Sequence, residues 1–136
     1  MVRYELAAFI RNAREVITDP AAEHQLIGQV YSRARGSAYK FLENYYHENE
    51  LEHDPFKVAQ HQSVSVQIDS ILPLSKATWQ VRWTEEESGL DGSPVGTTHW
   101  EAALDTTIIS ATSDASILEN PLGFYVTQLN WTEQRS

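Results

Sequence analysis

The segment Asn120-Pro121-Leu122-Gly123, which runs directly into Phe124–Trp131, decides the fold of this 136-residue chain. Proline presets the φ angle of a tight turn, and glycine accepts the positive φ that a side chain resists. The residues that follow are rich in the aromatic and β-branched types that favour strands. The pattern therefore predicts a sharp turn and then the final strand of a sheet, a structural signature that carries no reactive group.

Three earlier segments show the alternation of apolar and polar residues that is typical of half-buried strands. Their apolar positions, expected to face the core, are Val64, Val66 and Ile68 in the first, Trp79, Val81 and Trp83 in the second, and Trp100, Ala102 and Leu104 in the third. Between the second and third, Glu85–Pro94 has the Gly, Asp and Pro content of a long hairpin connection. Glu85, Glu86 and Glu87 make it the most acidic stretch, which we interpret as solvated.

Apolar residues at helical spacing precede these strands. The first predicted helix buries a stripe that contains Leu6, Phe9, Ile10 and Ala13, and its polar face includes Arg14. Asp19 is expected to cap a second helix that begins at Pro20.

The helical spacing then resumes after Gly36. The stripe from Ala38 to Tyr46 belongs either to a third helix capped by Ser37 or to a bent extension of the second. We interpret the polar segment Asn49–Gln62 as a surface connection. Helices followed by a four-stranded meander imply an α+β domain.

The composition is that of one globular domain. Hydrophobic residues make up 41% of the chain and charged residues 21%, which suits a chain that folds around one core. The formal net charge of −9 argues against binding to nucleic acid or to anionic lipid headgroups. The absence of cysteine excludes disulfides, thiolate catalysis and Cys-ligated zinc. No uncharged run approaches the ~20 apolar residues of a membrane-spanning helix.

No motif places a catalytic group or a metal ion. His47 and His53 are six residues apart, so they do not share a helix face at the spacing of a zinc site, and we interpret their segment as a solvated helix end and loop. His24 and His99 stand alone and are expected at the surface. The chain has no Gly-x-Ser-x-Gly elbow and no glycine-rich phosphate loop. We expect no catalytic residue, no metal and no cofactor.

Four segments together resemble the soluble domain of TrbF and its VirB8 relatives, which are inner-membrane assembly components of conjugative type IV secretion systems. They are the helical opening through Thr18-Asp19-Pro20, the strands Trp79–Trp83 and Thr97–Glu101, and the turn and strand Asn120–Thr127. The resemblance spans nearly the whole chain. It implies N-terminal amphipathic helices packed on a curved four-stranded antiparallel sheet, a nuclear-transport-factor-two-like cone.

The resemblance also implies a topology. Members of that family carry a cytoplasmic tail and one membrane-spanning helix before the soluble domain. Residues 1–136 are therefore expected to be a single periplasmic domain, with helices at about 2–48 and the sheet at about 63–133, on the periplasmic side of the bacterial inner membrane. Contact with the membrane would come only through the preceding helix, which this chain lacks.

The function that the resemblance implies is non-enzymatic assembly of a conjugal transfer channel. Expected partners are a second copy in a weak homodimer and other inner-membrane and periplasm-spanning channel components. The resemblance implies a self-association surface near Asn120–Gly123, where Leu122, if it is exposed, would offer an apolar contact. Tyr46 and the acidic residues Glu85, Glu86 and Glu87 form a second candidate partner surface.

Two other functions remain open from the sequence. One is a small cone-fold enzyme of the isomerase or dehydratase type, or a ligand-binding module, with a pocket between helices and sheet. The other is a cytosolic binding module. Because every predicted inward position on the strands is apolar, we expect a solidly filled cone without such a pocket.

Overall fold

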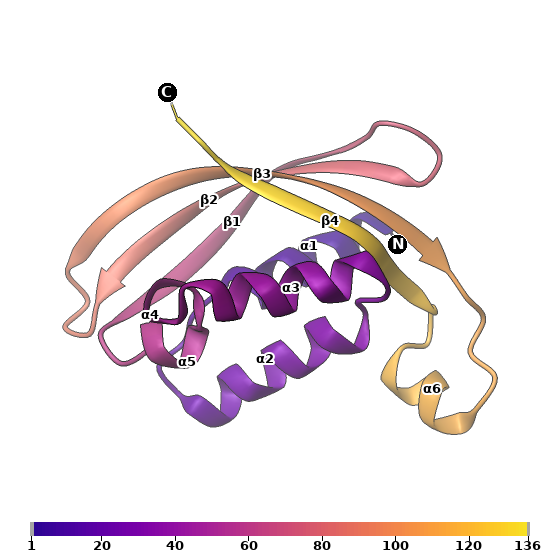
Figure 1. Ribbon diagram of the computed structural model, residues 1–136, viewed down its shortest axis with the longest axis horizontal. Helices are drawn as coiled ribbons and strands as arrows, with labels where there is room; N and C mark the ends of the chain where they lie inside the picture. The colour runs from indigo at the N-terminus through magenta and orange to yellow at the C-terminus, as the bar shows by residue number, and fades with distance from the viewer. Residues whose placement is uncertain (1, 136) are drawn as a thin grey trace.

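The computed structural model describes residues 2–135. In chain order the elements are α1 (Val2–Arg14), α2 (Pro20–Ser32), α3 (Ser37–Glu48), α4 (Glu50–His53), α5 (Pro55–Val58), β1 (Gln62–Pro73), β2 (Thr78–Gly89), β3 (Pro94–Ile108), α6 (Asp114–Glu119) and β4 (Phe124–Gln134). The strands form one sheet in the order β1-β2-β3-β4, and each neighbouring pair is antiparallel. Figure 1 shows this curved sheet arching over α1, α2 and α3. The predicted α+β arrangement is confirmed.

The curvature of the sheet coincides with irregularities in its pairing. The register shifts between Ile68 and Ser70 on β1, between Glu87 and Ser88 on β2, and between Asp105 and Thr106 on β3. An extra residue in one strand bends that strand and increases its local twist. Three such shifts let strands of 11 to 15 residues wrap around the helices instead of lying flat.

Both edges of the sheet are tied to the helical layer by main-chain hydrogen bonds. The segment after α1 pairs with β1, where the Val16 and Val64 amides each donate to the other's carbonyl at 3.0 and 2.9 Å. The segment after α2 pairs with β4, because the Arg35 amide donates to the Val126 carbonyl and the Val126 amide donates to the Arg33 carbonyl. These bridges fix the helices over the concave face and cover part of each exposed edge.

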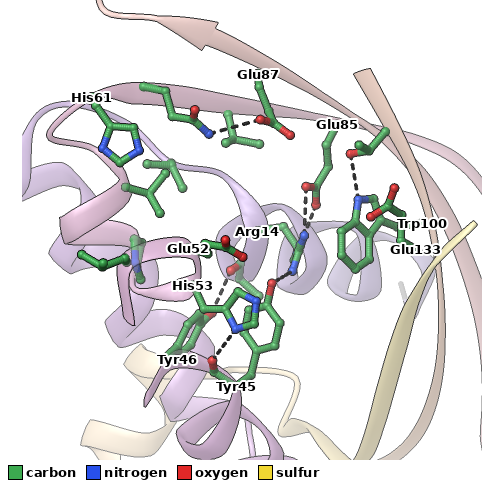
Figure 2. A pocket seen from close by; sticks show the side chains of 18 residues that line it. Arg14, Tyr45, Tyr46, Glu52, His53, His61, Glu85, Glu87, Trp100 and Glu133 are labelled. Carbon is green, nitrogen blue, oxygen red and sulfur yellow. Dashed lines mark hydrogen bonds and ion pairs between the residues drawn. The ribbon is translucent and has the colours of Figure 1, made fainter. Parts of the chain in front are cut away.

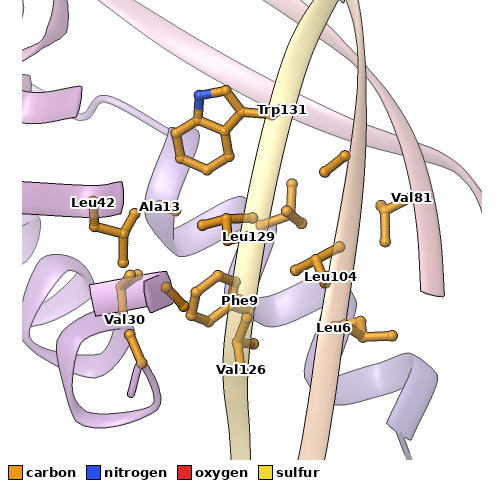
Figure 3. Packing of buried hydrophobic residues seen from close by; sticks show 14 of the residues in the cluster. Leu6, Phe9, Ala13, Val30, Leu42, Val81, Leu104, Val126, Leu129 and Trp131 are labelled. Carbon is orange, nitrogen blue, oxygen red and sulfur yellow. The ribbon is translucent and has the colours of Figure 1, made fainter. Parts of the chain in front are cut away.

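The core lies between that concave face and the helices, as Figure 3 shows. Trp83, Leu104 and Phe9 are completely or almost completely buried in it. The inward positions predicted for β2 and β3 are confirmed, since Val81 and Ala102 are also buried and Trp79 and Trp100 pack against the cluster. On β1, Val66 and Ile68 pack against the same cluster, whereas Val64 joins Val16 and Val58 in a smaller one.

The helix boundaries follow the local signals that the sequence carries. The Asp19 carboxylate accepts a hydrogen bond from the Ala21 amide at 3.0 Å, so the predicted cap of α2 is confirmed. Of the two alternatives for residues 38–46, the structure has a separate helix, α3, which follows Gly36 at a φ of 60°. The Ser37 hydroxyl does not cap it but donates to the Thr127 carbonyl of β4.

Two predicted connections are wrong. The segment Asn49–Gln62 contains α4 and α5, and Asp54 caps α5 in front of Pro55 in the same way that Asp19 caps α2. The acidic segment Glu85–Pro94 is mostly strand, because β2 continues to Gly89 and β3 begins at Pro94. In both segments the polar composition conceals regular structure. In the acidic segment the reason is that β2 and β3 extend beyond the part of the sheet that faces the apolar core.

Candidate functional site

A cavity of about 400 Å³ opens at the end of the cone where α4 and α5 lie. We call it the mouth cavity. Its lining comes from the end of α1, from α3 to α5 and from all four strands, and comprises Ala13, Arg14, Val16, Tyr45, Tyr46, Leu51, Glu52, His53, Pro55, Val58, His61, Gln62, Val64, Glu85, Glu87, Thr98, Trp100 and Glu133. The expectation of a solidly filled cone with only apolar inward residues is therefore wrong at this end.

An ion pair forms the inner wall of the mouth cavity. The Arg14 guanidinium binds the Glu85 carboxylate through two nitrogens, Nε to Oε2 at 2.5 Å and the second terminal nitrogen to Oε1 at 2.9 Å. Both side chains are more than nine-tenths buried. The Trp83 indole nitrogen also donates to Glu85 at 2.8 Å, so this carboxylate accepts hydrogen bonds from three donor groups. Such bidentate geometry is the strongest form of a charged pair.

Aromatic rings surround the guanidinium on the remaining sides. The Arg14 Cζ lies 4.0 Å from the ring centroid of Trp100, 5.0 Å from that of Trp131 and 5.3 Å from that of Tyr45. Arg14 also donates to the Tyr45 hydroxyl at 2.5 Å. Burial by itself lowers the pKa of Arg14, but the Glu85 carboxylate and the Tyr45 hydroxyl outweigh it and raise that pKa. Arg14 is therefore a permanent cation within an aromatic cage.

Three residues predicted at the surface line this cavity instead. Arg14 was expected on the polar face of its helix, and Glu85 and Tyr46 in a partner surface, yet Glu85 is 4% and Tyr46 6% exposed. The Tyr46 hydroxyl donates to the Ala13 carbonyl at 2.7 Å, so it has no free polar end to offer a partner. Of the other predicted acidic residues, Glu86 is exposed and Glu87 is half-buried beside the Gln62 amide.

The polar groups of the inner wall are occupied by one another. Burial raises the pKa of Tyr45 and of Tyr46, so both phenols are neutral, and Glu85 is bound to Arg14. His53 stacks on the Tyr45 ring at 4.0 Å and shares a hydrogen bond with the Tyr45 main-chain carbonyl. His47 lies at the surface and contacts the Glu43 carbonyl. Within residues 2–135, no three His, Asp or Glu side chains gather closely enough to hold a metal ion.

The predicted turn is present, and Asn120 organises it. Its amide nitrogen donates to the Phe124 carbonyl at 2.7 Å, and its amide oxygen accepts from the Phe124 amide at 3.2 Å. Asn120 is 4% exposed, so these two bonds satisfy a buried side chain and hold the first residue of β4. The role of Asn120 in the structure is therefore to fix the start of the strand.

Gly123 and Leu122 complete the turn from the inside. Gly123 has a φ of 71°, and a Cβ at this position would lie 1.8 Å from the Ile109 carbonyl oxygen, so no other residue fits. Leu122 is half-buried and packs against the core, so only part of its side chain is available for a contact with a partner. Only Pro121 of the four is exposed. The exposed apolar side chains nearby belong to the β3–β4 connection that precedes the turn, and are Ile109, Ile117 and Leu118.

The chain is similar to known proteins both in sequence and in fold. The family model described as VirB8 protein matches residues 1–134. The chain belongs to the VirB8 family. One relative, the conjugal transfer protein TrbF of Rhizobium radiobacter, is 29% identical over 136 residues. That alignment covers 98% of this chain and 60% of TrbF, so the chain spans about three-fifths of the length of this relative.

Several solved structures have the same fold as this chain. Agrobacterium tumefaciens VirB8 aligns with a TM-score of 0.84 at 15% identity, over 99% of this chain and 92% of that one. TrwG, a type IV secretion system component from Bartonella birtlesii, gives 0.78 at 19% identity over 98% and 91%. TraE, solved in complex with 4-(1H-pyrrol-1-yl)pyridine-2-carboxylic acid, gives 0.79 at 13% identity over 97% and 94%. The predicted nuclear-transport-factor-two-like cone is confirmed.

The described helices are all too short or too polar to be membrane spans. None of those within residues 2–135 combines the length and hydropathy needed to cross a bilayer. The longest of them have 13 residues, against the ~20 that the hydrocarbon core of a bilayer requires.

Proposed function

We propose that this chain is the periplasmic assembly module of a conjugative type IV secretion component and that it acts through protein contacts without catalysis. Membership in the VirB8 family and the alignment with a conjugal transfer protein support this role. The proposed partners are a second copy of the chain and other inner-membrane and periplasm-spanning components of the same channel. Attachment to the inner membrane would come from a helix that precedes residue 1.

The observation that carries the proposal is that the polar groups at the inner wall of the mouth cavity are bound to one another, while exposed apolar side chains gather in a different place, the β3–β4 connection. A catalytic site needs an acid, base or nucleophile that is free to react. At the inner wall of the mouth cavity, Glu85 and Tyr45 are both bound to Arg14, and the Tyr46 hydroxyl donates to the Ala13 carbonyl. This occupancy weighs against the isomerase or dehydratase alternative, which requires an uncommitted group at the base of the pocket.

One group of exposed apolar side chains lies away from the mouth cavity, in the β3–β4 connection. Leu118 is 85% exposed, and Ile117 and Ile109 are about half exposed. Exposed apolar side chains that gather on one segment are typical of protein contact surfaces. We therefore assign self-association to the β3–β4 connection, with α6 in place of Leu122 as the contacting element.

The test is replacement of Leu118 by arginine. A charge at this position would be desolvated in a contact between two copies, and we expect the dimerisation constant to weaken by at least about tenfold, or about 1.4 kcal/mol. Sedimentation equilibrium over a concentration series up to about 1 mM, the range of a weak homodimer, measures it. Tryptophan fluorescence checks that the variant is folded.

Leu90→Arg is the matched control, because Leu90 is 62% exposed at the tip between β2 and β3. This variant should associate like the parent chain. If Leu118→Arg and the parent have the same association constant, the assignment of the surface is wrong. A parent chain that stays monomeric throughout the series would contradict the homodimer itself.

A further inference from the structure

The rim of the mouth cavity is strongly acidic. Four carboxylates line it, from Glu52, Glu85, Glu87 and Glu133, against the single guanidinium of Arg14. With neutral histidines the lining therefore has a net charge of −3. Glu85 is bound to Arg14, so the other three carboxylates determine the field that a ligand meets. Figure 2 shows them around the opening, on α4, β2 and β4.

These three carboxylates have little or no compensation. Within residues 2–135, the exposed carboxylates of Glu52 and Glu133 make no hydrogen bond or ion pair, and the Glu87 carboxylate accepts only one long bond of 3.3 Å from the Gln62 side-chain amide. Carboxylates that converge on a partly enclosed space repel one another, and low-dielectric walls strengthen the field between them. A cation in that space would relieve the repulsion.

Part of the wall of the mouth cavity is apolar. Val16, Val58 and Val64 form a separate small cluster there, and all three face the cavity. The buried Pro55 and the exposed Leu51 also line the cavity. The volume of about 400 Å³ falls within the range of about 300–1,000 Å³ that is usual for small-ligand sites. A suitable occupant therefore has a narrow apolar stem and a positively charged end.

We propose that the mouth cavity receives an arginine or lysine side chain from an extended basic segment of a partner protein. The aliphatic stem would lie along the valine wall, and the cationic end would reach the Glu52, Glu87 and Glu133 carboxylates. An anionic ligand fits the same space poorly. Among the described residues that line the cavity, Arg14 is the only arginine or lysine, and its guanidinium already donates to Glu85 and Tyr45. This site is distinct from the β3–β4 connection, so either assignment can fail alone.

The chain offers a matched pair of variants to test the site. Glu86 and Glu87 are neighbours on β2, but strand geometry points their side chains to opposite faces. Glu87 lines the cavity and Glu86 does not. Glu87→Gln and Glu86→Gln therefore remove the same charge from the same strand, and long-range electrostatics changes almost equally in both.

The probe is a blocked tripeptide with a central arginine, compared with the same peptide containing citrulline, which has the same shape and no charge. Binding is followed by NMR through the indole N–H signal of Trp100, which faces the cavity and donates to Thr98 at 2.9 Å. A Trp100→Phe variant assigns that signal. We expect saturable binding of the arginine peptide only. Glu87→Gln should weaken it about two- to fivefold, and Glu87→Gln combined with Glu133→Gln about tenfold.

Several outcomes would overturn the proposal. One is equal binding of the arginine and citrulline peptides, which would indicate an apolar site without charge recognition. Another is equal weakening by Glu86→Gln and Glu87→Gln, which would show attraction to the overall negative charge and not to the cavity. Saturable binding of benzoate at the Trp100 signal, with no binding of the arginine peptide, would assign the cavity to anions.

Discussion

The mouth cavity and the turn Asn120–Gly123 lie in different parts of the same cone and contrast in every physical respect. At the inner wall of the mouth, two charged side chains, Arg14 and Glu85, are buried and satisfy each other. At the turn, the buried polar group is a neutral amide, Asn120, which satisfies main-chain groups of β4. The apolar surface lies beside the turn, in α6. Asn120–Gly123, which the sequence suggested as a contact motif, therefore hold the start of β4 in place. Arg14 and Glu85, which the sequence suggested as solvated surface, line the cavity.

The contrast also separates two sources of stability. The turn depends on backbone shape, because one position accepts only glycine. The mouth depends on electrostatic compensation, because a buried charge without its partner is strongly destabilising. Substitutions at the two sites should therefore fail for different reasons and by different amounts.

The largest effect is expected for Gly123→Ala. The added Cβ would lie 1.8 Å from the Ile109 carbonyl oxygen, and a φ of 71° is itself unfavourable for alanine. Backbone on both sides must move, so we expect a loss of about 4 kcal/mol in the free energy of unfolding. Urea denaturation followed by tryptophan fluorescence measures this loss.

Gly92→Ala is the control for that prediction. Gly92 also has a positive φ, of 85°, but no atom lies within 4 Å of the position that an added methyl group would take, so only the conformational penalty of about 1 kcal/mol applies. Similar losses for the two variants would show that the close approach of Ile109 does not constrain the turn.

The next largest effect is expected for Arg14→Met. Methionine fills much of the same space, but the Glu85 carboxylate is left buried with only Trp83 as donor. We expect a loss of about 3 kcal/mol in the free energy of unfolding, the usual cost of removing one partner from a buried pair. Thermal and urea denaturation at pH 7 measure it.

Arg82→Met provides the comparison on the outside of the sheet. Arg82 pairs with Glu101 at 2.7 Å, but its side chain is 58% exposed, so its loss should cost no more than about 0.5 kcal/mol. A second variant, Arg14→Met with Glu85→Leu, should recover part of the stability because it removes the uncompensated charge. Equal losses for Arg14→Met and Arg82→Met would mean that the mouth pair is effectively solvated.

Much of the fold could be predicted because short-range rules act alone in those segments. The cap at Asp19, the apolar stripe of α1 and the alternation along β2 and β3 each express a preference that the tertiary structure does not oppose. The helices α4 and α5 could not, since each is only four residues long. A four-residue helix shows too little of the 3.6-residue period to reveal itself, although Asp54-Pro55 carries the capping signal.

The mouth cavity was hidden for a different reason. The period-two pattern of β2 continues from Val81 and Trp83 to Glu85 and Glu87, and Arg14 continues the stripe of α1 one turn beyond Ile10. Both signals place charged side chains inside, but each charge alone would be too costly to bury. Burial becomes favourable only because α1 and β2 bring Arg14 and Glu85 together, 71 residues apart in the sequence. Local patterns cannot show that pairing.

The smallest effect is expected for a substitution of Glu23. Unlike Glu85, Glu23 is a buried carboxyl group without a cationic partner among the described residues, so it tests what happens when a buried acid is not paired. This carboxyl group in α2 is completely buried, yet it has no cationic partner within residues 2–135. Its Oε1 accepts a hydrogen bond from the Ile17 amide at 2.9 Å, and its Oε2 has no partner among the described residues. Burial, assisted by the nearby Glu15 carboxylate, raises the pKa of Glu23 from 4.5 to about 7, although the Ile17 bond opposes this shift.

A raised carboxyl pKa means that the folded state binds the proton more tightly than the unfolded state does. The contribution of Glu23 to stability is therefore fully present below pH 4.5 and is lost as the pH rises to about 7. Glu23→Gln keeps an acceptor for the Ile17 amide and cannot ionise, so we expect it to be more stable than the parent by about 1–2 kcal/mol at pH 8 and nearly equal at pH 5. Urea denaturation at both values measures the difference, with Glu86→Gln as an exposed control. A gain of the same size at both pH values would show that Glu23 does not titrate between them, and the contrast with the compensated Glu85 would not hold.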